Sequence, residues 1–376
     1  MRVILAAGGS GGHIFPSIAL AEALREKGVE DVYCVASSRR LDRNILEGAP
    51  YRCFFLSANP MPRKFSPVKT AVFLSKLAYD VGYSLSVLVR VRPSVLVGFG
   101  GYSSGAISVM SKLLGIPLII HEQNLVPGRA NRILSRVADR IAVSFRDSAG
   151  YFGRAAAKTV YTGNPLRTGM LTNDRGVSAK RLGIAPDKMT VLVMGGSQGS
   201  SFLNNEVSAA AKRINSEKRG EVQFIHLTGA DDHNKVAEFY SSNGIPGRVV
   251  SFLERIDDAY ACSDIAVSRS GAAAVFELAY YEKPMILIPY PNPGNNQRTN
   301  AAVFSRAGAA IYREEKDLTS DSLYKDMILL LEDKDKRKAM SEAAGGLKAG
   351  GAADSLAEEV IKIATRNTPL VAEKIE

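Results

Sequence analysis

VILAAGGSGG at Val3–Gly12 and VLVMGGSQGS at Val191–Ser200 are the two stretches that decide the fold. Each is a short apolar run that ends in glycines and precedes a helical pattern, which is typical of a strand that enters a helix through a tight turn. A second similar pair follows in the same order, at Val97–Ile120 and Ala266–Pro289. Because strands and helices alternate almost throughout, the sequence predicts an α/β protein with two similar doubly wound domains, whose parallel sheets are covered by helices.

The 376 residues suit about two domains. The N-terminal domain is predicted to span 1–163, ending near the Gly163-Asn164-Pro165 turn, and the C-terminal domain to span 164–350. A glycine-rich hinge, Lys348–Ser355, leads to a last helix within 352–366, which we expect to complete the N-terminal domain.

Composition excludes several classes of protein. With 46% hydrophobic and 23% charged residues, the chain is neither disordered nor fibrous. Its cysteines, Cys34, Cys53 and Cys262, form no disulfide framework and no zinc-type spacing, so we expect a reducing compartment. The start of the chain lacks the pattern of a signal peptide, and no run of about 18 apolar residues predicts a membrane-spanning helix.

The positive charge is concentrated in the first half. Residues 1–160 contain 21 basic and 10 acidic residues, whereas the overall net charge is +10. We therefore expect an anionic partner there: nucleic acid, an anionic membrane or a phosphorylated substrate. The segment Met61–Arg92 has a net charge of +5, a pattern that suits the surface of an anionic bilayer when apolar residues accompany it. The apolar residues are Val68, Val72, Phe73, Leu77 and Tyr83. The alternative is that these apolar residues form core; no nucleic-acid-binding motif accompanies the charge.

The glycine turns are candidate phosphate sites. Gly8–Gly12 follows a strand and begins a helix, and glycines let a phosphate or diphosphate approach helix amides closely. The loop is not a Walker motif, because no Lys-Ser/Thr pair follows it. The alternative is a turn needed for packing alone. His13, next in the chain, is the strongest candidate for a general base.

The second domain repeats this arrangement. Ser197 can add a hydroxyl to the Gly195–Gly199 turn, and Gly271–Glu277 opens another helix with small residues. Glu277 is a candidate acceptor for a ribose diol, with a solvated helix charge as the alternative. Asn296 and Gln297 offer amides that suit sugar hydroxyls.

Polar residues also follow the strand that ends at Ile120. His121-Glu122-Gln123-Asn124 lies where α/β sheets bind ligands. For His121 we prefer a buried hydrogen-bond network that holds loops, whereas Asn124 is the better ligand candidate. Arg167, after the predicted domain boundary, could neutralise a leaving diphosphate. The acid pair in Asp333-Lys334-Asp335 is more typical of a solvated helix end than of a metal site.

Seven motifs in this order resemble those of the MurG family of peptidoglycan glycosyltransferases, over roughly residues 1–365. They are GGSGGHIFP at the first turn, GGYSSG at Gly100–Gly105, HEQN at His121–Asn124, GNPLR at Gly163–Arg167, GGSQG at Gly195–Gly199, SRSGA at Ser268–Ala272 and NNQRTNA at Asn295–Ala301. The resemblance implies a GT-B fold, with two Rossmann-like domains facing a central cleft.

The resemblance also implies a reaction. It is the transfer of N-acetylglucosamine (GlcNAc) from UDP-GlcNAc to the muramyl 4-hydroxyl of lipid I, an undecaprenyl-diphosphate-linked muramyl peptide. The product is lipid II, and the new β1,4 linkage has inverted configuration. We expect a peripheral enzyme on the cytoplasmic face of the bacterial inner membrane, with the anionic membrane surface as partner and no nucleic acid. No cofactor is required; a divalent metal is possible but not indicated.

Site residues are implied motif by motif. His13 matches the proposed catalytic base, which Glu122 would assist, and Tyr102, His13 and Asn124 match positions near the acceptor. The implied donor-binding residues are Ser10, Gly11, Gly12, Asn124, Arg167, Ser197, Leu253, Ala272, Ala273, Ala274, Val275, Phe276, Glu277, Asn296 and Gln297. Ala274 stands where the family usually has threonine, and the acceptor turn reads GYSSGA where GYVSGP is common.

Three alternatives remain. A UDP-GlcNAc 2-epimerase of similar architecture would epimerise the donor without an acceptor. A glycosyltransferase could act on another lipid, such as diacylglycerol; competition between acceptors would distinguish it from an enzyme that acts on lipid I. A non-catalytic nucleotide-sugar or membrane-surface module would bind UDP without turnover.

Overall fold

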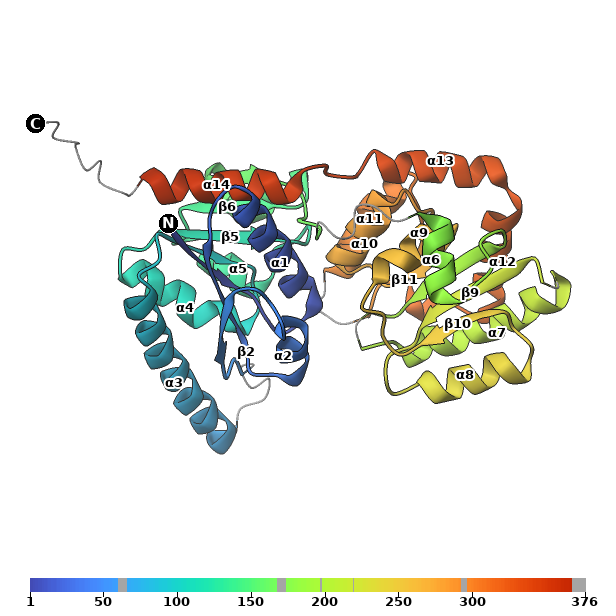
Figure 1. The fold of residues 1–376 in the computed structure, drawn as a ribbon, viewed down its shortest axis with the longest axis horizontal. Coiled ribbons are helices and arrows are strands. Elements are labelled where there is room, and N and C mark those ends of the chain that lie inside the picture. Colours follow the sequence, from blue (N-terminus) through green and yellow to red (C-terminus); the bar gives the residue numbers. More distant parts are fainter. Residues whose placement is uncertain (60–65, 168–173, 197, 219, 292–295, 367–376) are drawn as a thin grey trace, which may run out of the picture. The chain divides into compact units, whose positions relative to one another are not determined.

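The computed structural model describes residues 1–59, 66–167, 174–196, 198–218, 220–291 and 296–366. The chain forms two compact units, and each is a Rossmann-like α/β domain (Figure 1). Unit 1 comprises Met1–Thr168 and Gly351–Glu376, and unit 2 comprises Gly169–Gly350. The predicted fold class, two doubly wound domains with parallel sheets, is confirmed.

Unit 1 is built on a seven-stranded parallel sheet of order β3-β2-β1-β4-β5-β6-β7. The strands are β1 (Arg2–Ala6), β2 (Asp31–Ser37), β3 (Arg52–Leu56), β4 (Val95–Gly98), β5 (Leu118–Glu122), β6 (Arg140–Val143) and β7 (Thr159–Tyr161). The strand order reverses between β1 and β4. Ligands of doubly wound sheets bind outside the carboxyl ends of the strands at such a point.

The helices of unit 1 cover its sheet. They are α1 (Gly11–Glu26), α2 (Arg40–Leu46), α3 (Pro67–Val91), α4 (Tyr102–Leu113), α5 (Arg129–Leu134), the 3-10 segment η1 (Arg146–Lys158) and α14 (Ala352–Arg366). Although α14 is last in the chain, its Leu356 and Val360 lie in one hydrophobic cluster with Leu20 and Leu24 of α1. The C-terminal helix is therefore part of the core of unit 1.

Unit 2 repeats the topology with six parallel strands, in the order β10-β9-β8-β11-β12-β13. The strands are β8 (Met189–Met194), β9 (Val222–Leu227), β10 (Gly247–Val250), β11 (Ile265–Ser268), β12 (Met285–Leu287) and β13 (Ala310–Tyr312). The helices are α6 (Arg175–Leu182), α7 (Ser201–Glu217), α8 (His233–Ser242), α9 (Ile256–Cys262), α10 (Ala272–Tyr280), α11 (Gln297–Arg306), η3 (Glu315–Asp317), α12 (Ser320–Glu332) and α13 (Lys334–Gly345). Its order reverses between β8 and β11.

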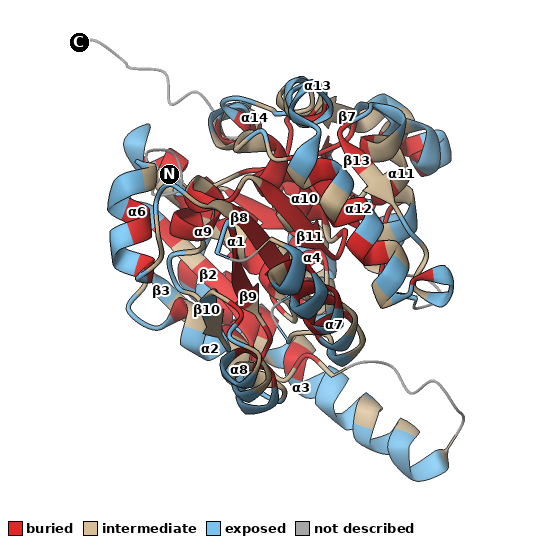
Figure 2. Cartoon of the chain, turned by 90° about the vertical axis from the view of Figure 1, so that its right-hand side faces the viewer, coloured by how far each residue is buried: buried red, intermediate tan, exposed pale blue. Residues whose placement is uncertain are grey.

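The central strands carry the cores. Val3 and Val97 in unit 1, like Val191 and Val267 in unit 2, are fully buried, and Figure 2 shows the strands as predominantly buried. Burying one such side chain contributes about 1.5–3 kcal/mol, so near-continuous apolar strands bind helices on both faces. This packing fixes the strand ends from which the loops of each unit emerge.

Helix α3 is exposed over much of its length. Val87, Leu88 and Val91 near its C-terminal end are buried in the core of unit 1, whereas Val68 and Val72 near its start are 73% and 48% exposed. The helix is drawn mostly as exposed in Figure 2. The alternative that the apolar residues of this segment form core is therefore wrong for Val68, Val72 and Leu77, whereas Tyr83 packs against the core of unit 1.

The sequence predicts no membrane-spanning helix, yet α3 has the length and apolar composition to cross a membrane, with 22% of its most apolar window buried. Only the length and the composition of α3 are those of a membrane-spanning helix. Its C-terminal turns pack within the core of unit 1.

Candidate functional site

The first glycine loop, Gly8–Gly12, leaves β1 at the switch point of unit 1. Gly9 has a φ of 87°, and a Cβ atom at Gly8 would lie 2.8 Å from Oδ2 of Asp42. The backbone N–H of Gly9 donates to that same oxygen at 2.8 Å. Asp42 is 1% exposed and also accepts from the backbone and hydroxyl of Ser37. A buried carboxylate, which sequence analysis misses, therefore fixes the loop.

The loop runs directly into α1. Ser10 precedes the helix in an extended conformation, and Gly11 and Gly12 form its first turn. Among the described residues, no side chain caps this turn. Backbone N–H groups and the helix dipole at such a terminus favour an anion, which agrees with the expected phosphate role of these three residues.

His13 faces a second glycine turn and the loop after β5. Its Nδ1 atom lies 3.1 Å from Oε1 of Gln123. Gly100 and Gly101 have φ values of 90° and 80°, and Cβ atoms there would lie 3.5 and 3.4 Å from the His13 ring. Tyr102 begins α4 from this turn and is 58% exposed. The structure thus brings together the predicted base and the turn expected to meet the acceptor.

His121 belongs to a buried network, as preferred from the sequence. It is fully buried at the end of β5, and its Nε2 atom lies 3.1 Å from the carbonyl oxygen of Gly163. Burial lowers the pKa of His121 to about 4, so the ring is neutral near pH 7. A neutral, enclosed ring of this kind ties β5 to the segment after β7.

Glu122 is 1% exposed, and both of its carboxylate oxygens accept hydrogen bonds. Oε1 accepts from the backbone and side-chain nitrogens of Asn124, both at 3.0 Å. Oε2 accepts from the backbone of Gly128 at 3.0 Å and from Nδ2 of Asn131 at 2.9 Å. These contacts order the loop after β5, and the expected help with proton transfer gains no support from them. Asn124, partly exposed, is held in place by the same carboxylate.

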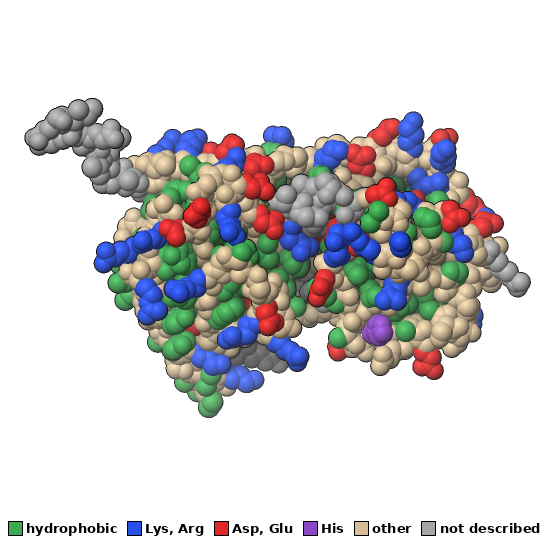
Figure 3. Space-filling model, viewed as in Figure 1, with side chains coloured by type: hydrophobic (Ala, Val, Ile, Leu, Met, Phe, Trp, Pro, Cys, Tyr) green, Lys and Arg blue, Asp and Glu red, His purple; other side chains and the backbone are tan. Residues whose placement is uncertain are grey.

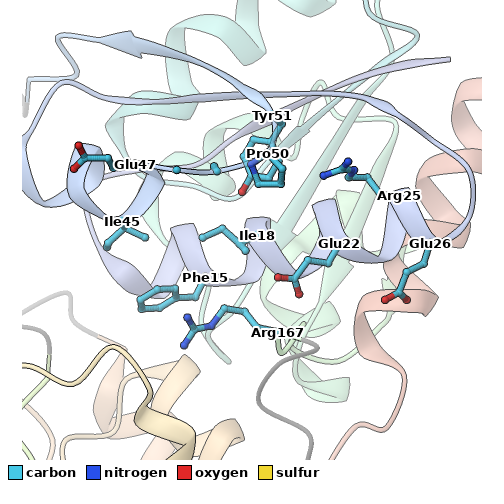
Figure 4. Close-up of a pocket in the computed structure, with 12 residues that line it drawn as sticks. Phe15, Ile18, Glu22, Arg25, Glu26, Ile45, Glu47, Pro50, Tyr51 and Arg167 are labelled. Atoms are coloured by element: carbon cyan, nitrogen blue, oxygen red, sulfur yellow. The ribbon is translucent and has the colours of Figure 1, made fainter.

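Arg167 lies over the ring of Phe15, with 4.4 Å between the guanidinium carbon and the ring centroid. Both residues line a cavity of about 490 Å³ along α1, in which the other charged groups include Glu22 and Arg25 (Figure 4). The Phe15 ring also lies 3.0 Å from where a Cβ atom of Gly11 would be. A cation over an aromatic face is attracted by about 0.5–2 kcal/mol. Phe15, which sequence analysis does not single out, therefore places Arg167 beside the first glycine loop.

The loop between β8 and α7 in unit 2 also needs its glycines. A Cβ atom at Gly199, whose φ is 77°, would lie 2.0 Å from the carbonyl oxygen of Thr228, and one at Gly195 would lie 2.6 Å from the nitrogen of Ser200. Ser200 caps α7 by accepting from the backbone N–H of Leu203. Ser197, the predicted hydroxyl donor, lies outside the described residues.

The helix predicted to hold the diphosphate, α10, contains partly exposed residues in its first turn and buried residues after them. Ala273 and Ala274 are partly exposed in its first turn, which suits close approach of an anion. Val275 and Phe276 are buried, at 0% and 5% exposed, so the part expected of them in donor binding would have to come from their backbone. Glu277 is 7% exposed and accepts from the hydroxyl of Tyr260 at 2.6 Å.

The other donor-site candidates of unit 2 lie on nearby loops. Asn296 precedes α11, and the side chain of Gln297 accepts from the backbone N–H of Tyr290 at 2.9 Å. The hydroxyl of Ser270 donates to the carbonyl of Gln297 at 2.9 Å, which joins the start of α11 to the start of α10. Leu253, partly exposed, lies in the loop before α9.

Arg269 connects these loops, although sequence analysis does not single it out. Its side chain is 6% exposed and pairs with Glu315 at 2.5 Å. It donates to Ser200 at 2.7 Å and to the carbonyl oxygens of Ile288 and Pro289 at 3.2 Å each. The loops after β8, β12 and β13 are therefore held by one guanidinium. No group of three or more His, Cys, Asp or Glu side chains able to hold a metal occurs within the described part of the chain.

Comparison with known proteins assigns both units to one family. Residues 3–143 match the N-terminal domain of glycosyltransferase family 28, and residues 190–359 match its C-terminal domain. The UDP-N-acetylglucosamine–N-acetylmuramyl-(pentapeptide) pyrophosphoryl-undecaprenol N-acetylglucosamine transferase of Desulforudis audaxviator is 35% identical over 378 residues, covering 98% of this chain and 100% of that protein. The chain belongs to the MurG family. It is a glycosyltransferase, as the ordered motifs predict.

Solved structures support the fold. MurG of Acinetobacter baumannii is 24% identical, with a TM-score of 0.72 over 96% of this chain and 99% of that one. The UDP-GlcNAc 2-epimerase of Neisseria meningitidis, in complex with UDP-GlcNAc, has a TM-score of 0.66 at 18% identity over 96% of this chain and 100% of that one. Because both proteins share the fold, the fold alone does not separate a MurG transferase from an epimerase; the sequence relatives do.

Proposed function

We propose that this protein transfers GlcNAc from UDP-GlcNAc to the muramyl 4-hydroxyl of lipid I, with inversion, and so forms lipid II. The observation that carries the proposal is the match to a transferase named for this reaction, over 98% of this chain and all of that protein. The two glycine loops and the polar strand ends of both units support it, because they provide sites for phosphate and sugar groups.

In unit 1, His13 is the proposed general base. It would take the proton of the 4-hydroxyl while that oxygen forms a bond to the anomeric carbon and the bond from this carbon to the diphosphate oxygen breaks. General-base assistance contributes typically about 10²–10⁴-fold to a rate. Ser10, Gly11 and Gly12 would meet phosphate, and Tyr102 and Asn124 would meet the acceptor.

In unit 2, the start of α10 would hold the diphosphate of the donor. Amides at a helix N-terminus stabilise the charge that develops on the leaving UDP. Arg167, which belongs to unit 1, is the proposed guanidinium for that charge. Gln297, fixed by its contact with Tyr290, is the proposed reader of the sugar hydroxyls with Asn296. We propose that these groups serve in place of an obligatory metal ion.

We also propose that α3 holds the protein on the cytoplasmic face of the inner membrane. Val68, Leu74 and Tyr79 on this helix are 73%, 56% and 62% exposed, and Lys69 and Lys76 lie among them. Figure 3 shows hydrophobic and basic side chains interleaved over this part of unit 1. Apolar side chains that enter the headgroup region and cations that meet anionic lipids are the two components of peripheral binding.

The proposed reaction is tested by measuring UDP release from UDP-GlcNAc, with and without a lipid I analogue, in the presence of a chelator. We expect release that requires the acceptor and persists in chelator. Epimerised donor without acceptor would favour the 2-epimerase alternative. Confirmed UDP binding with no release would contradict either the acceptor or the metal-independent step, and added divalent metal or diacylglycerol would decide between them.

The membrane proposal predicts the behaviour of the double variant Val68→Ser/Leu74→Ser. Because burying one such side chain contributes about 1.5–3 kcal/mol, we expect binding to phosphatidylglycerol vesicles to weaken by about tenfold or more. Co-sedimentation measures the effect, and Leu329→Ser, an exposed leucine of unit 2, is the matched control. Equal binding of the double variant and the control would contradict the role of α3. If vesicle binding did not depend on salt concentration or on phosphatidylglycerol content, the role of the basic residues of α3 would be contradicted.

A further inference from the structure

Three side chains of unit 1 form a continuous hydrogen-bonded line. Nδ1 of His13 lies 3.1 Å from Oε1 of Gln123, Nε2 of Gln123 lies 3.1 Å from Nδ1 of His121, and Nε2 of His121 lies 3.1 Å from the carbonyl oxygen of Gly163. His121 and Gln123 are 0% and 2% exposed. Protein groups alone therefore decide where the protons of this line lie, and they can be assigned by asking which atoms are able to donate.

The orientation of the Gln123 amide is fixed by backbone carbonyls. Its Nε2 atom lies 3.1 Å from the oxygen of Phe99 and 3.3 Å from the oxygen of His121. Carbonyl oxygens only accept hydrogen bonds, so the amide nitrogen must face them and the amide oxygen must face His13. That oxygen is also only an acceptor. Nδ1 of His13 must then carry a hydrogen and donate it.

The far end of the line leads to the same assignment. Nε2 of His121 faces the carbonyl of Gly163, so it carries the hydrogen of that ring. Burial lowers the pKa of His121 to about 4, which keeps the ring neutral and leaves Nδ1 as an acceptor for Gln123. A flip of the Gln123 amide would break contacts at both of its ends.

We propose that Gln123 and His121 are positioning residues that hold the proton of neutral His13 on Nδ1 and leave the lone pair on Nε2. This rests on the proposed function for its consequence: Nε2 is the atom that takes the proton of the acceptor hydroxyl. The ring then becomes an imidazolium whose Nδ1–H still donates to Gln123. An amide oxygen at that place orients the ring and stabilises its charge without competing for the proton.

The tautomer can be measured directly, because the chain has only four histidines. In protein labelled with ¹⁵N-histidine, two-bond proton–nitrogen spectra above pH 8 distinguish a protonated from an unprotonated ring nitrogen. We expect Nδ1–H for His13 and Nε2–H for His121, with His13→Gln assigning the first signal. His13 in the Nε2–H form would overturn the proposal.

His226 of unit 2 is an internal reference for the method. Its Nε2 lies 3.1 Å from Oδ1 of Asn204, whose Nδ2 donates to the carbonyl of Thr228, so the Nε2–H form is expected there.

A variant tests whether Gln123 causes the preference. Gln123→Met keeps the length of the side chain and removes both hydrogen-bonding ends, so we expect His13 to populate both tautomers. The matched control is Gln223→Met, since Gln223 is a 3% exposed amide of unit 2 that bonds Ala185 and Thr190. An unchanged His13 tautomer in folded Gln123→Met would overturn the proposal.

Kinetics separate this proposal from the proposed function. We expect Gln123→Met to lower kcat by up to the roughly 10²–10⁴-fold that a general base contributes, with KM for UDP-GlcNAc unchanged, and Gln223→Met to leave kcat unchanged. If Gln123 had a purely structural role, both variants would lose stability alike, and Gln123→Met would not show a lower kcat at unchanged KM. That result would overturn the proposal. A shifted tautomer with unchanged kcat would support the proton placement and contradict His13 as the base.

Discussion

Replacing His13 with glutamine is expected to lower kcat by roughly 10²–10⁴-fold, the range that general-base assistance contributes. Glutamine retains a polar side chain in the first turn of α1 but cannot accept a proton near neutral pH. Because the amides of the glycine loop and all groups of unit 2 remain, UDP binding should be unchanged. Single-turnover rates with a lipid I analogue, together with calorimetric UDP binding, measure both quantities.

His233→Gln is the matched control for this experiment. His233 begins α8 of unit 2, lies partly exposed and contacts Asn234, so its replacement should leave turnover unchanged. Turnover of His13→Gln within twofold of the wild type would remove His13 from the base role. A parallel loss of UDP affinity would indicate instead that the substitution disturbs the first turn of α1.

The fold was predictable because its signals are local. The apolar strands before Gly8 and Gly195 are buried on both faces of parallel sheets, so they read as continuous apolar runs, and the glycines follow where a side chain would collide with the next loop. At α10 the same local reasoning predicts a ligand site, because the helix starts with small residues. The structure adds that Val275, within one turn of that start, is fully buried.

The residues that sequence analysis misses act across long separations. Asp42 bonds Gly9 from another helix, Phe15 lies under Arg167 at the far end of unit 1, and Arg269 pairs with Glu315 beyond β13. No periodicity or motif spacing predicts such partners, because residues far apart in the sequence come into contact only when the sheet and its helices have assembled. The four donors to Glu122, which come from Asn124, Gly128 and Asn131, are likewise not evident from the motif HEQN.

Arg269 gives the largest expected effect on stability. Replacing it with methionine removes the partner of Glu315 and the donors to Ser200, Ile288 and Pro289, in a place where the side chain is 6% exposed. Breaking a buried ion pair by removing one partner typically costs about 3–5 kcal/mol, because the remaining charge is left uncompensated. Hydrogen exchange of unit 2 amides measures this loss in that unit alone. UDP affinity should fall as well, since the loops after β8 and β12 are freed together.

Two further variants decide whether loss of the Arg269–Glu315 pair causes the lower stability of Arg269→Met. Arg306→Met is the control, because Arg306 is exposed on α11 and donates to the carbonyl of Ala302 in its own helix. Substitutions at such surface positions usually change stability by less than about 0.5 kcal/mol. Arg269→Met/Glu315→Leu should regain part of the lost stability, because it removes the carboxylate that lost its partner. It should not regain UDP affinity, because the contacts that Arg269 makes with the loops are still absent.

If Arg269→Met lost no more stability than Arg306→Met, the guanidinium would not be what holds these loops. If the double variant regained UDP affinity too, the stranded charge rather than the loop contacts would account for the binding defect.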